Sequence, residues 1–192
     1  MPKIILVAGY SASGKTRVGR ELARRLGKCC YLDKDTLFEP MVNRLVVALG
    51  QPTGDRDSEL YRSEVRPLEY QCLMDAGFEA ALFGVPVLLS APFLYQLTDD
   101  AWMQWLIREA DSRGLKLLIV WVSCPHEILR QRMIDRRSPR DRAKLADWPT
   151  YSASIDEEFH RRIRSECLVF DNRGPAQFEA EMGRILASIL PT

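Results

Sequence analysis

The chain has 192 residues, of which 46% are hydrophobic and 28% are charged, a composition typical of one globular domain with a sizeable core. Lysine and arginine total 27 against 26 acidic residues, so no overall field favours nucleic acid or an anionic membrane surface. No apolar run approaches the ~20 residues of a membrane span, and no signal peptide fits before the first strand, so the sequence predicts a cytoplasmic protein.

The first predicted element is a buried strand that runs directly into a phosphate-binding loop. The apolar run Ile4–Ala8 has the length of a strand buried on both faces of a parallel sheet. The following residues, Gly9-Tyr10-Ser11-Ala12-Ser13-Gly14-Lys15-Thr16, match the pattern G-x-x-x-x-G-K-[ST] in full. A helix is expected over residues 15–27, and its N-terminus would point its dipole at the bound phosphates.

The residue types in this loop suit a nucleoside triphosphate. Gly9 ends the strand where a side chain would crowd the turn, and Gly14 lets backbone N–H groups converge on an anion. Lys15 can reach the β- and γ-phosphates, and the Thr16 hydroxyl can ligate Mg²⁺. The expected ligands are therefore ATP and Mg²⁺. The expected nucleotide contacts are Gly9, Ser11, Ala12, Ser13, Gly14, Lys15, Thr16 and Arg17.

Strands and helices alternate along the rest of the chain. Further strands are expected at residues 29–32, 85–89, 115–123 and 168–170. Helices are expected at 36–49, at 58–83 with a break near Pro67, from Asp99 or Asp100 to Arg113, and at 126–137, 153–165 and 175–190. This alternation predicts an α/β fold with a parallel sheet. We expect one domain over residues 1–192, with a charged insertion at about 136–150.

Two carboxylates follow the second predicted strand, at the sheet edge where ligands of α/β proteins bind. Asp33 and Asp35 are two positions apart, so on an extended strand end they would share a face. Asp35 is the candidate general base, because phosphoryl transfer to a hydroxyl needs a carboxylate near the acceptor oxygen. Asp33 would support Mg²⁺ or its waters. Alternatively, either carboxylate caps the following helix at Thr36.

An arginine-rich segment follows the fourth predicted strand. It contains Arg130, Arg132, Arg136, Arg137, Arg140 and Arg142. Mobile arginines stabilise the negative charge of a transferring phosphoryl group and exclude water, so this segment is expected to form a lid. Arg132 and Arg136 are the first candidates for a catalytic role. The alternative is the solvated face of a basic helix.

The candidate acceptor site draws on the long helix before the third strand and on the end of that strand. Arg66, Glu69 and Tyr70 have i, i+3, i+4 spacing, so they cover one helix face that could line a pocket or form a salt-bridged surface. The expected acceptor contacts are Asp35, Arg66, Tyr70 and Ser90. The third and fourth strands lack the terminal Asp of motor ATPases, which favours a small kinase that holds Mg²⁺ through Thr16, waters and an Asp after the second strand.

These features resemble the small P-loop kinases that phosphorylate hydroxyl groups, which are often labelled AAA family ATPases. Similar members are chloramphenicol phosphotransferase, the zeta-toxin-like kinases, gluconate kinase and the kinase domain of polynucleotide kinase. The resemblance rests on the phosphate loop, Asp35-Thr36-Leu37, Arg66-Pro67-Leu68-Glu69 and the arginine-rich lid. It implies a three-layer fold with five parallel strands in the order 2-3-1-4-5, Asp35 as base and Lys15 on the phosphates. At Ser90-Ala91-Pro92 the chain departs from chloramphenicol phosphotransferase, which carries acidic residues there.

The sequence therefore predicts a kinase that transfers the γ-phosphate of ATP to a hydroxyl of a small molecule, such as an antibiotic, a sugar or a nucleoside. A polynucleotide 5′-hydroxyl is a second acceptor hypothesis, disfavoured by the near-neutral charge and the lack of a basic stripe outside the lid. A third hypothesis is a nucleotide-binding regulator or ATPase switch, against which the paired carboxylates and the lid argue. The oligomeric state is left open, a homodimer included.

Overall fold

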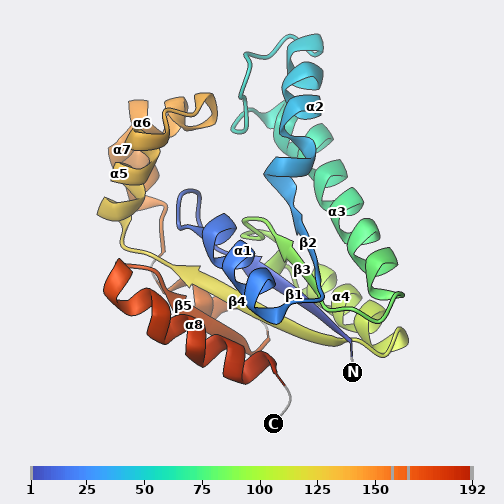
Figure 1. Cartoon of the computed structure of the whole chain (residues 1–192). Coiled ribbons are helices and arrows are strands. Elements are labelled where there is room, and N and C mark those ends of the chain that lie inside the picture. The colour runs from blue at the N-terminus through green and yellow to red at the C-terminus, as the bar shows by residue number, and fades with distance from the viewer. Residues whose placement is uncertain (1, 157, 164, 191–192) are drawn as a thin grey trace.

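A five-stranded parallel sheet, in the order β2-β3-β1-β4-β5, forms the centre of the molecule (Figure 1). The computed structural model describes residues 2–156, 158–163 and 165–190. The strands are β1 (Lys3–Ala8), β2 (Cys30–Asp33), β3 (Val87–Ser90), β4 (Lys116–Ser123) and β5 (Cys167–Asp171). The α/β class, the parallel direction and the strand order are all as the sequence analysis expected.

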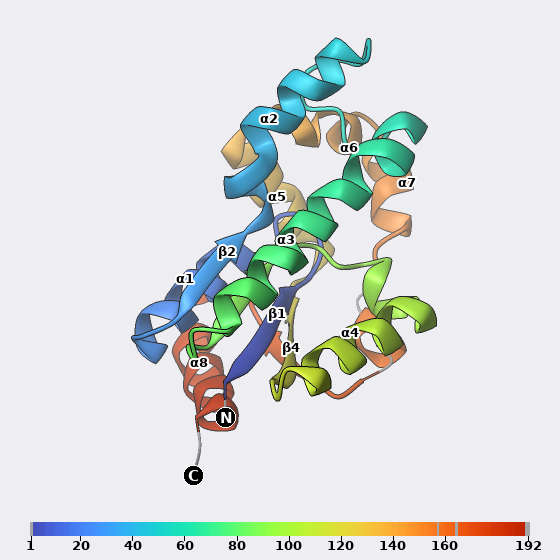
Figure 2. The same ribbon diagram turned by 90° about the vertical axis from the view of Figure 1, so that its right-hand side faces the viewer.

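Helices cover both faces of the sheet (Figures 1 and 2). One face carries α1 (Lys15–Leu26) and α8 (Pro175–Ile189), and the other carries α3 (Arg66–Ala81) and α4 (Asp100–Ser112). The remaining helices, α2 (Lys34–Ala48), α5 (His126–Arg136), α6 (Arg142–Ala146) and α7 (Trp148–Ala153), rise beyond the carboxyl ends of the strands, on either side of the phosphate loop. No helix among the described residues is long and apolar enough to cross a membrane.

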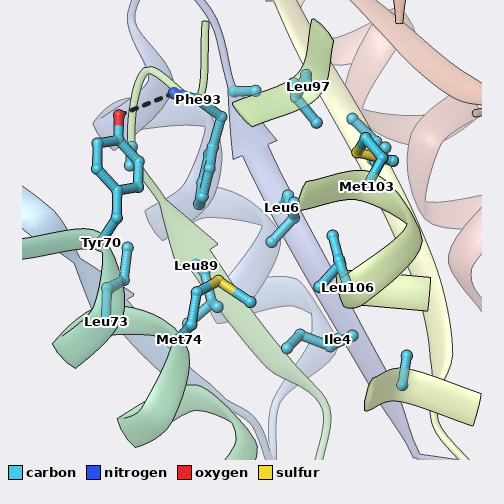
Figure 3. Packing of buried hydrophobic residues seen from close by; sticks show 14 of the residues in the cluster. Ile4, Leu6, Tyr70, Leu73, Met74, Leu89, Phe93, Leu97, Met103 and Leu106 are labelled. Carbon is cyan, nitrogen blue, oxygen red and sulfur yellow. Dashed lines mark hydrogen bonds between the residues drawn. The ribbon is translucent and has the colours of Figure 1, made fainter. Parts of the chain in front are cut away.

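Side chains of β1 alternate between two separate cores, as the two faces of a strand require. Ile5 and Val7 pack with α1 and α8, whereas Ile4 and Leu6 pack with α3 and α4 (Figure 3). All of β1 from Ile4 to Ala8 is fully buried, which confirms the expectation of a strand covered on both faces. A rigid strand therefore ends directly at the phosphate loop.

Register places the strand ends at one edge of the sheet. Asp33 at the end of β2 pairs with Ser90 at the end of β3, and Ser123 pairs with Asp171 across β4 and β5. Near Pro67 the helix is irregular but not broken: a π-helical turn, Tyr61–Val65, runs directly into α3, and Pro67 lies in the first turn of that helix.

The helix expected over residues 153–165 is wrong. Instead, α7 begins at Trp148 and ends at Ala153, and a single 3₁₀ turn, Phe159–Arg162, follows among the described residues. Asp147 starts α7 early by accepting a hydrogen bond from Thr150 N. The chain then turns inward, because Phe159 is buried and stacks on Trp121 with ring centroids 4.6 Å apart. Core packing has overridden the local helical pattern.

The expected extended strand end at Asp33 and Asp35 is wrong as well. Lys34 already begins α2, so the two carboxylates leave different elements and do not share a strand face. The physical reason is the capping alternative: Asp33 Oδ1 accepts a hydrogen bond from Thr36 N at 3.0 Å. Asp35 consequently lies in the first turn of α2.

Candidate active site

The phosphate loop, residues 9–16, has a backbone that glycine permits. Gly9 and Gly14 have φ values of 146° and 96°, and Ala12 also has a positive φ of 63°. A Cβ on Gly14 would collide with Nδ2 of Asn172, so a side chain does not fit there. Such left-handed turns aim successive N–H groups at one anion, at the N-terminus of α1.

Two side chains from other elements donate hydrogen bonds to main-chain carbonyls of this loop. Asn172, which follows β5, is buried and donates from Nδ2 to the Ser13 carbonyl at 2.7 Å. Arg132 on α5 donates to the same carbonyl at 3.0 Å and to the Asn172 carbonyl at 3.0 Å. Arg132, expected to be catalytic, thus holds main-chain carbonyls in this structure. Sequence reasoning gave Asn172 no role, although its place after a strand at the ligand-binding edge is a usable signal.

Gly14→Ala tests the loop geometry. The substitution combines a strained φ with a collision at Asn172, and strain of about 1–3 kcal/mol corresponds to a loss of roughly 5- to 150-fold in nucleotide affinity. Titration with a fluorescent ADP analogue measures this loss. Gly183→Ala on α8 is the matched control, because its Cβ would meet open space, and its nucleotide affinity should equal that of the wild type. Equal affinities of both variants would contradict the assignment of this loop.

Lys15 is half-buried, and among the described residues no carboxylate accepts a hydrogen bond from it. Its Nζ donates to the Tyr10 carbonyl at 2.7 Å. Burial lowers the pKa of Lys15 to about 8, although the nearby charges of Asp35 and Asp33 oppose that shift. A bound phosphate would place a further negative charge beside this ammonium and favour its protonated form.

Thr16 and Asp33 lie side by side where a cation could bind. The Thr16 hydroxyl donates to Asp33 Oδ2 at 2.9 Å, so the lone pairs of Thr16 Oγ1 stay free for a metal. Asp33 can support a metal and cap a helix at once, because its other oxygen caps α2. Among the described residues no cluster of three or more His, Cys, Asp or Glu could hold a metal. The oxygens of Thr16 and Asp33 are of the kind that Mg²⁺ takes, and a Mg²⁺ held by few protein ligands keeps several waters and binds phosphates.

Asp35 is surrounded by cations. Its Oδ2 lies 2.5 Å from Arg140 Nη1, and its Oδ1 lies 3.6 Å from Lys34 Nζ. Burial raises the pKa of Asp35, but the charges of Lys34, Arg140, Lys15 and Arg56 together outweigh that effect and hold the pKa below its ordinary value. Asp35 is therefore a carboxylate at neutral pH, the form that a general base needs.

The arginine-rich segment forms a lid over this site. Arg136 donates from Nη2 to the Ser11 hydroxyl at 2.8 Å and to Asp141 Oδ1 at 2.6 Å, and Asp141 is fully buried. Arg136 thus contacts the phosphate loop, and its catalytic role stays a prediction. Arg140 reaches Asp35 instead. Sequence reasoning did not rank Arg140 above its neighbours, because spacing alone does not tell which arginine meets the base.

The lid also touches the loop that follows α2, residues 51–57. A Cβ on Gly54 would lie 2.9 Å from Pro139 Cβ, and Lys144 Nζ is 2.9 Å from Asp57 Oδ2. Figure 1 shows this loop approaching α6 from the side of α2. These contacts close the lid over the carboxyl edge of the sheet, and they join segments too distant in sequence for local patterns to predict.

A cavity of about 760 Å³ connects these groups, a volume suited to a nucleotide. Its walls include Ser11, Ala12, Gly14, Lys15, Thr16, Arg17, Asp33, Asp35, Ser90, Arg132, Arg136 and Arg140. Most of the expected site residues are thus brought together around one space. Gly9 and Ser13 are not among the described residues that line it, and Ser13 is buried behind the loop.

Two expected acceptor contacts lie elsewhere. Arg66 stacks over the ring of Tyr95, with its guanidinium carbon 4.2 Å from the centroid. The buried Tyr70 hydroxyl accepts a hydrogen bond from Phe93 N at 3.0 Å (Figure 3). Neither is among the described residues that line the cavity, whereas Asp35 and Ser90 are. An acceptor contact from Arg66 or Tyr70 stays a prediction that this arrangement does not support directly.

Known proteins share this fold. The family model described as an AAA domain matches residues 4–157. The Mus musculus protein named "Probable gluconokinase" is 30% identical over 146 residues, which are 71% of this chain and 73% of that protein. A gluconokinase from Sinorhizobium meliloti 1021 superposes with a TM-score of 0.57 at 21% identity, over 98% of this chain and 93% of its own. A shikimate kinase from Bacteroides thetaiotaomicron has a TM-score of 0.59 at 18% identity, over 98% of each chain.

Proposed function

We propose that this chain, which belongs to the AAA-domain family, transfers the γ-phosphate of ATP, with Mg²⁺, to an alcohol group of a small, sugar-like molecule, and that Asp35 is its general base. One observation carries the proposal: Lys15, Thr16 and Asp35 line the same cavity. The phosphate loop and a carboxylate therefore face each other across the space where a phosphoryl group would pass.

In the proposed reaction, Lys15 and the loop amides bind the β- and γ-phosphates. Asp35 accepts the proton of the acceptor hydroxyl as the acceptor oxygen attacks the γ-phosphorus, and ADP departs with the electron pair of the broken P–O bond. Thr16, directly, and Asp33, through water, would hold the metal, which neutralises phosphate charge when bound. Arg136 lies at the phosphate loop, where it can stabilise the charge of the transferring group.

Among sugar-like acceptors we favour a sugar acid such as D-gluconate. Arg140 lines the cavity beside Asp35, and its guanidinium can pair with an acceptor carboxylate. The gluconokinase name of the Mus musculus and Xenopus tropicalis relatives supports the same class. Nucleosides and neutral antibiotics such as chloramphenicol lack such a carboxylate and are the weaker candidates.

ATP consumption with Mg²⁺ tests the proposal against a panel of acceptors. The panel holds D-gluconate, D-glucose, shikimate, nucleosides, chloramphenicol and a short oligonucleotide. We expect D-gluconate to stimulate turnover most. D-glucose, its neutral counterpart, should stimulate turnover at least tenfold less, because a contact with the carboxylate that contributes about 1.4 kcal/mol to binding corresponds to a factor of ten. Equal rates with D-gluconate and D-glucose would contradict recognition of an acceptor carboxylate. Tight nucleotide binding with a flat panel would favour a regulatory ATPase switch.

A further inference from the structure

Behind Asp35 lies a buried chain of polar side chains that the proposed reaction does not use. Lys34 Nζ is 2.7 Å from Glu69 Oε1, and the Tyr61 hydroxyl donates to Glu69 Oε2 at 2.6 Å. The exposed fractions of Tyr61, Lys34 and Glu69 are only 4%, 4% and 3%. The chain thus connects the π-helical turn, α3 and the first residue of α2 inside the protein.

A buried ion pair is an unusual way to join helices. Removing two charges from water is costly, and apolar side chains of similar volume often stabilise a fold as well or better. Apolar packing is already in use nearby, since Val42, Val46 and Val65 form a small core between α2 and the same turn. The charges at Lys34 and Glu69 therefore call for a reason beyond joining α2 to α3.

The position of Lys34 suggests that reason. The two oxygens of Asp35 lie near different cations: Oδ1 is 3.6 Å from Nζ of the buried Lys34, and Oδ2 is 2.5 Å from Nη1 of Arg140 in the lid. Lids of kinases open and close around their substrates. Arg140 can consequently leave Oδ2, whereas the ion pair with Glu69 keeps the Lys34 ammonium near Oδ1.

We propose that Lys34 is a positioning residue for phosphoryl transfer: locked by Glu69 and Tyr61, it holds Oδ1 of Asp35 so that Oδ2 faces the acceptor hydroxyl. This inference rests on the proposed function, because it takes Asp35 as the base. During transfer the acceptor proton passes to Oδ2, the acceptor oxygen bonds to the γ-phosphorus, and ADP leaves with the electrons of the broken bond. Lys34 neither gives nor takes a proton in this step.

The double variant Lys34→Met/Glu69→Gln tests the role with little risk to the fold. It replaces both buried charges by neutral groups of similar size, and the new amide oxygen can still accept the hydrogen bond from the Tyr61 hydroxyl. Asp35 then loses its partner at Oδ1. Because small displacements of a reacting group are costly, we expect kcat to fall about 10- to 100-fold while KM for ATP stays unchanged. Tyr61→Phe, which loosens only Glu69, should lower kcat less and is the second variant if the double variant unfolds.

A double-mutant cycle separates positioning from a merely structural role. The rates are ATP turnover with D-gluconate and, without acceptor, ATP hydrolysis by water. In an Asp35→Asn background the Lys34→Met/Glu69→Gln change should lower kcat by less than about twofold further, because the carboxylate that Lys34 positions is absent. An equal loss in both backgrounds, or an unchanged kcat, would overturn the positioning role alone. An Asp35→Asn variant as active as the wild type would instead remove the base, and the proposed function with it.

Discussion

Asp35→Asn should abolish phosphoryl transfer and leave nucleotide binding almost intact. The amide is nearly isosteric with the carboxylate but cannot accept the acceptor proton, and loss of a general base typically costs about 10²- to 10⁴-fold in rate. Asp35 acts on Lys15 through its charge and not through a hydrogen bond. We therefore expect kcat to fall by that factor, and ADP affinity measured by calorimetry to change less than about threefold.

Glu39→Gln is the matched control for this experiment. Glu39 lies one turn further along α2, and its Oε1 is 3.7 Å from the same lid nitrogen of Arg140 that meets Asp35. Its substitution removes the same charge from the same helix but leaves the base in place. A selective loss in Asp35→Asn identifies the base. Comparable losses of kcat in both variants would mean that transfer needs negative charge near Arg140 and not a base at Asp35. A fully active Asp35→Asn would refute the assignment of Asp35 as the base.

The position of the phosphate loop could be predicted because the residues that define it are local, whereas the contacts of Asn172 and Arg132 with the loop could not. The glycine spacing fixes the left-handed turns at Gly9 and Gly14, and Lys15 and Thr16 follow in the same stretch. The buried strands were equally readable, since β1 and β4 are runs of apolar residues that need no partner to be recognised. Asp35 could be found because α/β folds bring strand ends to a common edge.

The rest of the site depends on contacts between distant segments. Arg140 meets Asp35 only after the lid folds back, and the pairing of Lys34 with Glu69 requires α2 to pack on α3. No periodicity marks either pair. The same limit explains the missing helix over residues 153–165, where burial of Phe159 against Trp121 outweighs the local pattern.

Lys15→Met should remove most nucleotide affinity together with its pH dependence. A hydrogen bond from a charged group is worth about 1.5–3 kcal/mol, so ADP should bind roughly 10- to 150-fold more weakly. In the wild type the free pKa of Lys15 is about 8, and a bound phosphate raises it by favouring the ammonium. Binding therefore takes up a proton where free Lys15 is partly neutral. Affinity is greatest below pH 8 and falls as the pH rises above it.

Calorimetric titration with ADP at pH 7 and at pH 8.5, in two buffers of different ionisation enthalpy, measures that proton directly. The phosphates of ADP are already ionised at pH 8.5, since such groups titrate near pH 6, so uptake there reports the protein. We expect clear uptake by the wild type at pH 8.5, little at pH 7, and none by Lys15→Met. Lys28→Met, which changes an exposed lysine before β2, should behave as the wild type. If Lys15→Met still takes up a proton at pH 8.5, the proton belongs to another group, and the proposed role of the Lys15 ammonium in phosphate binding is contradicted.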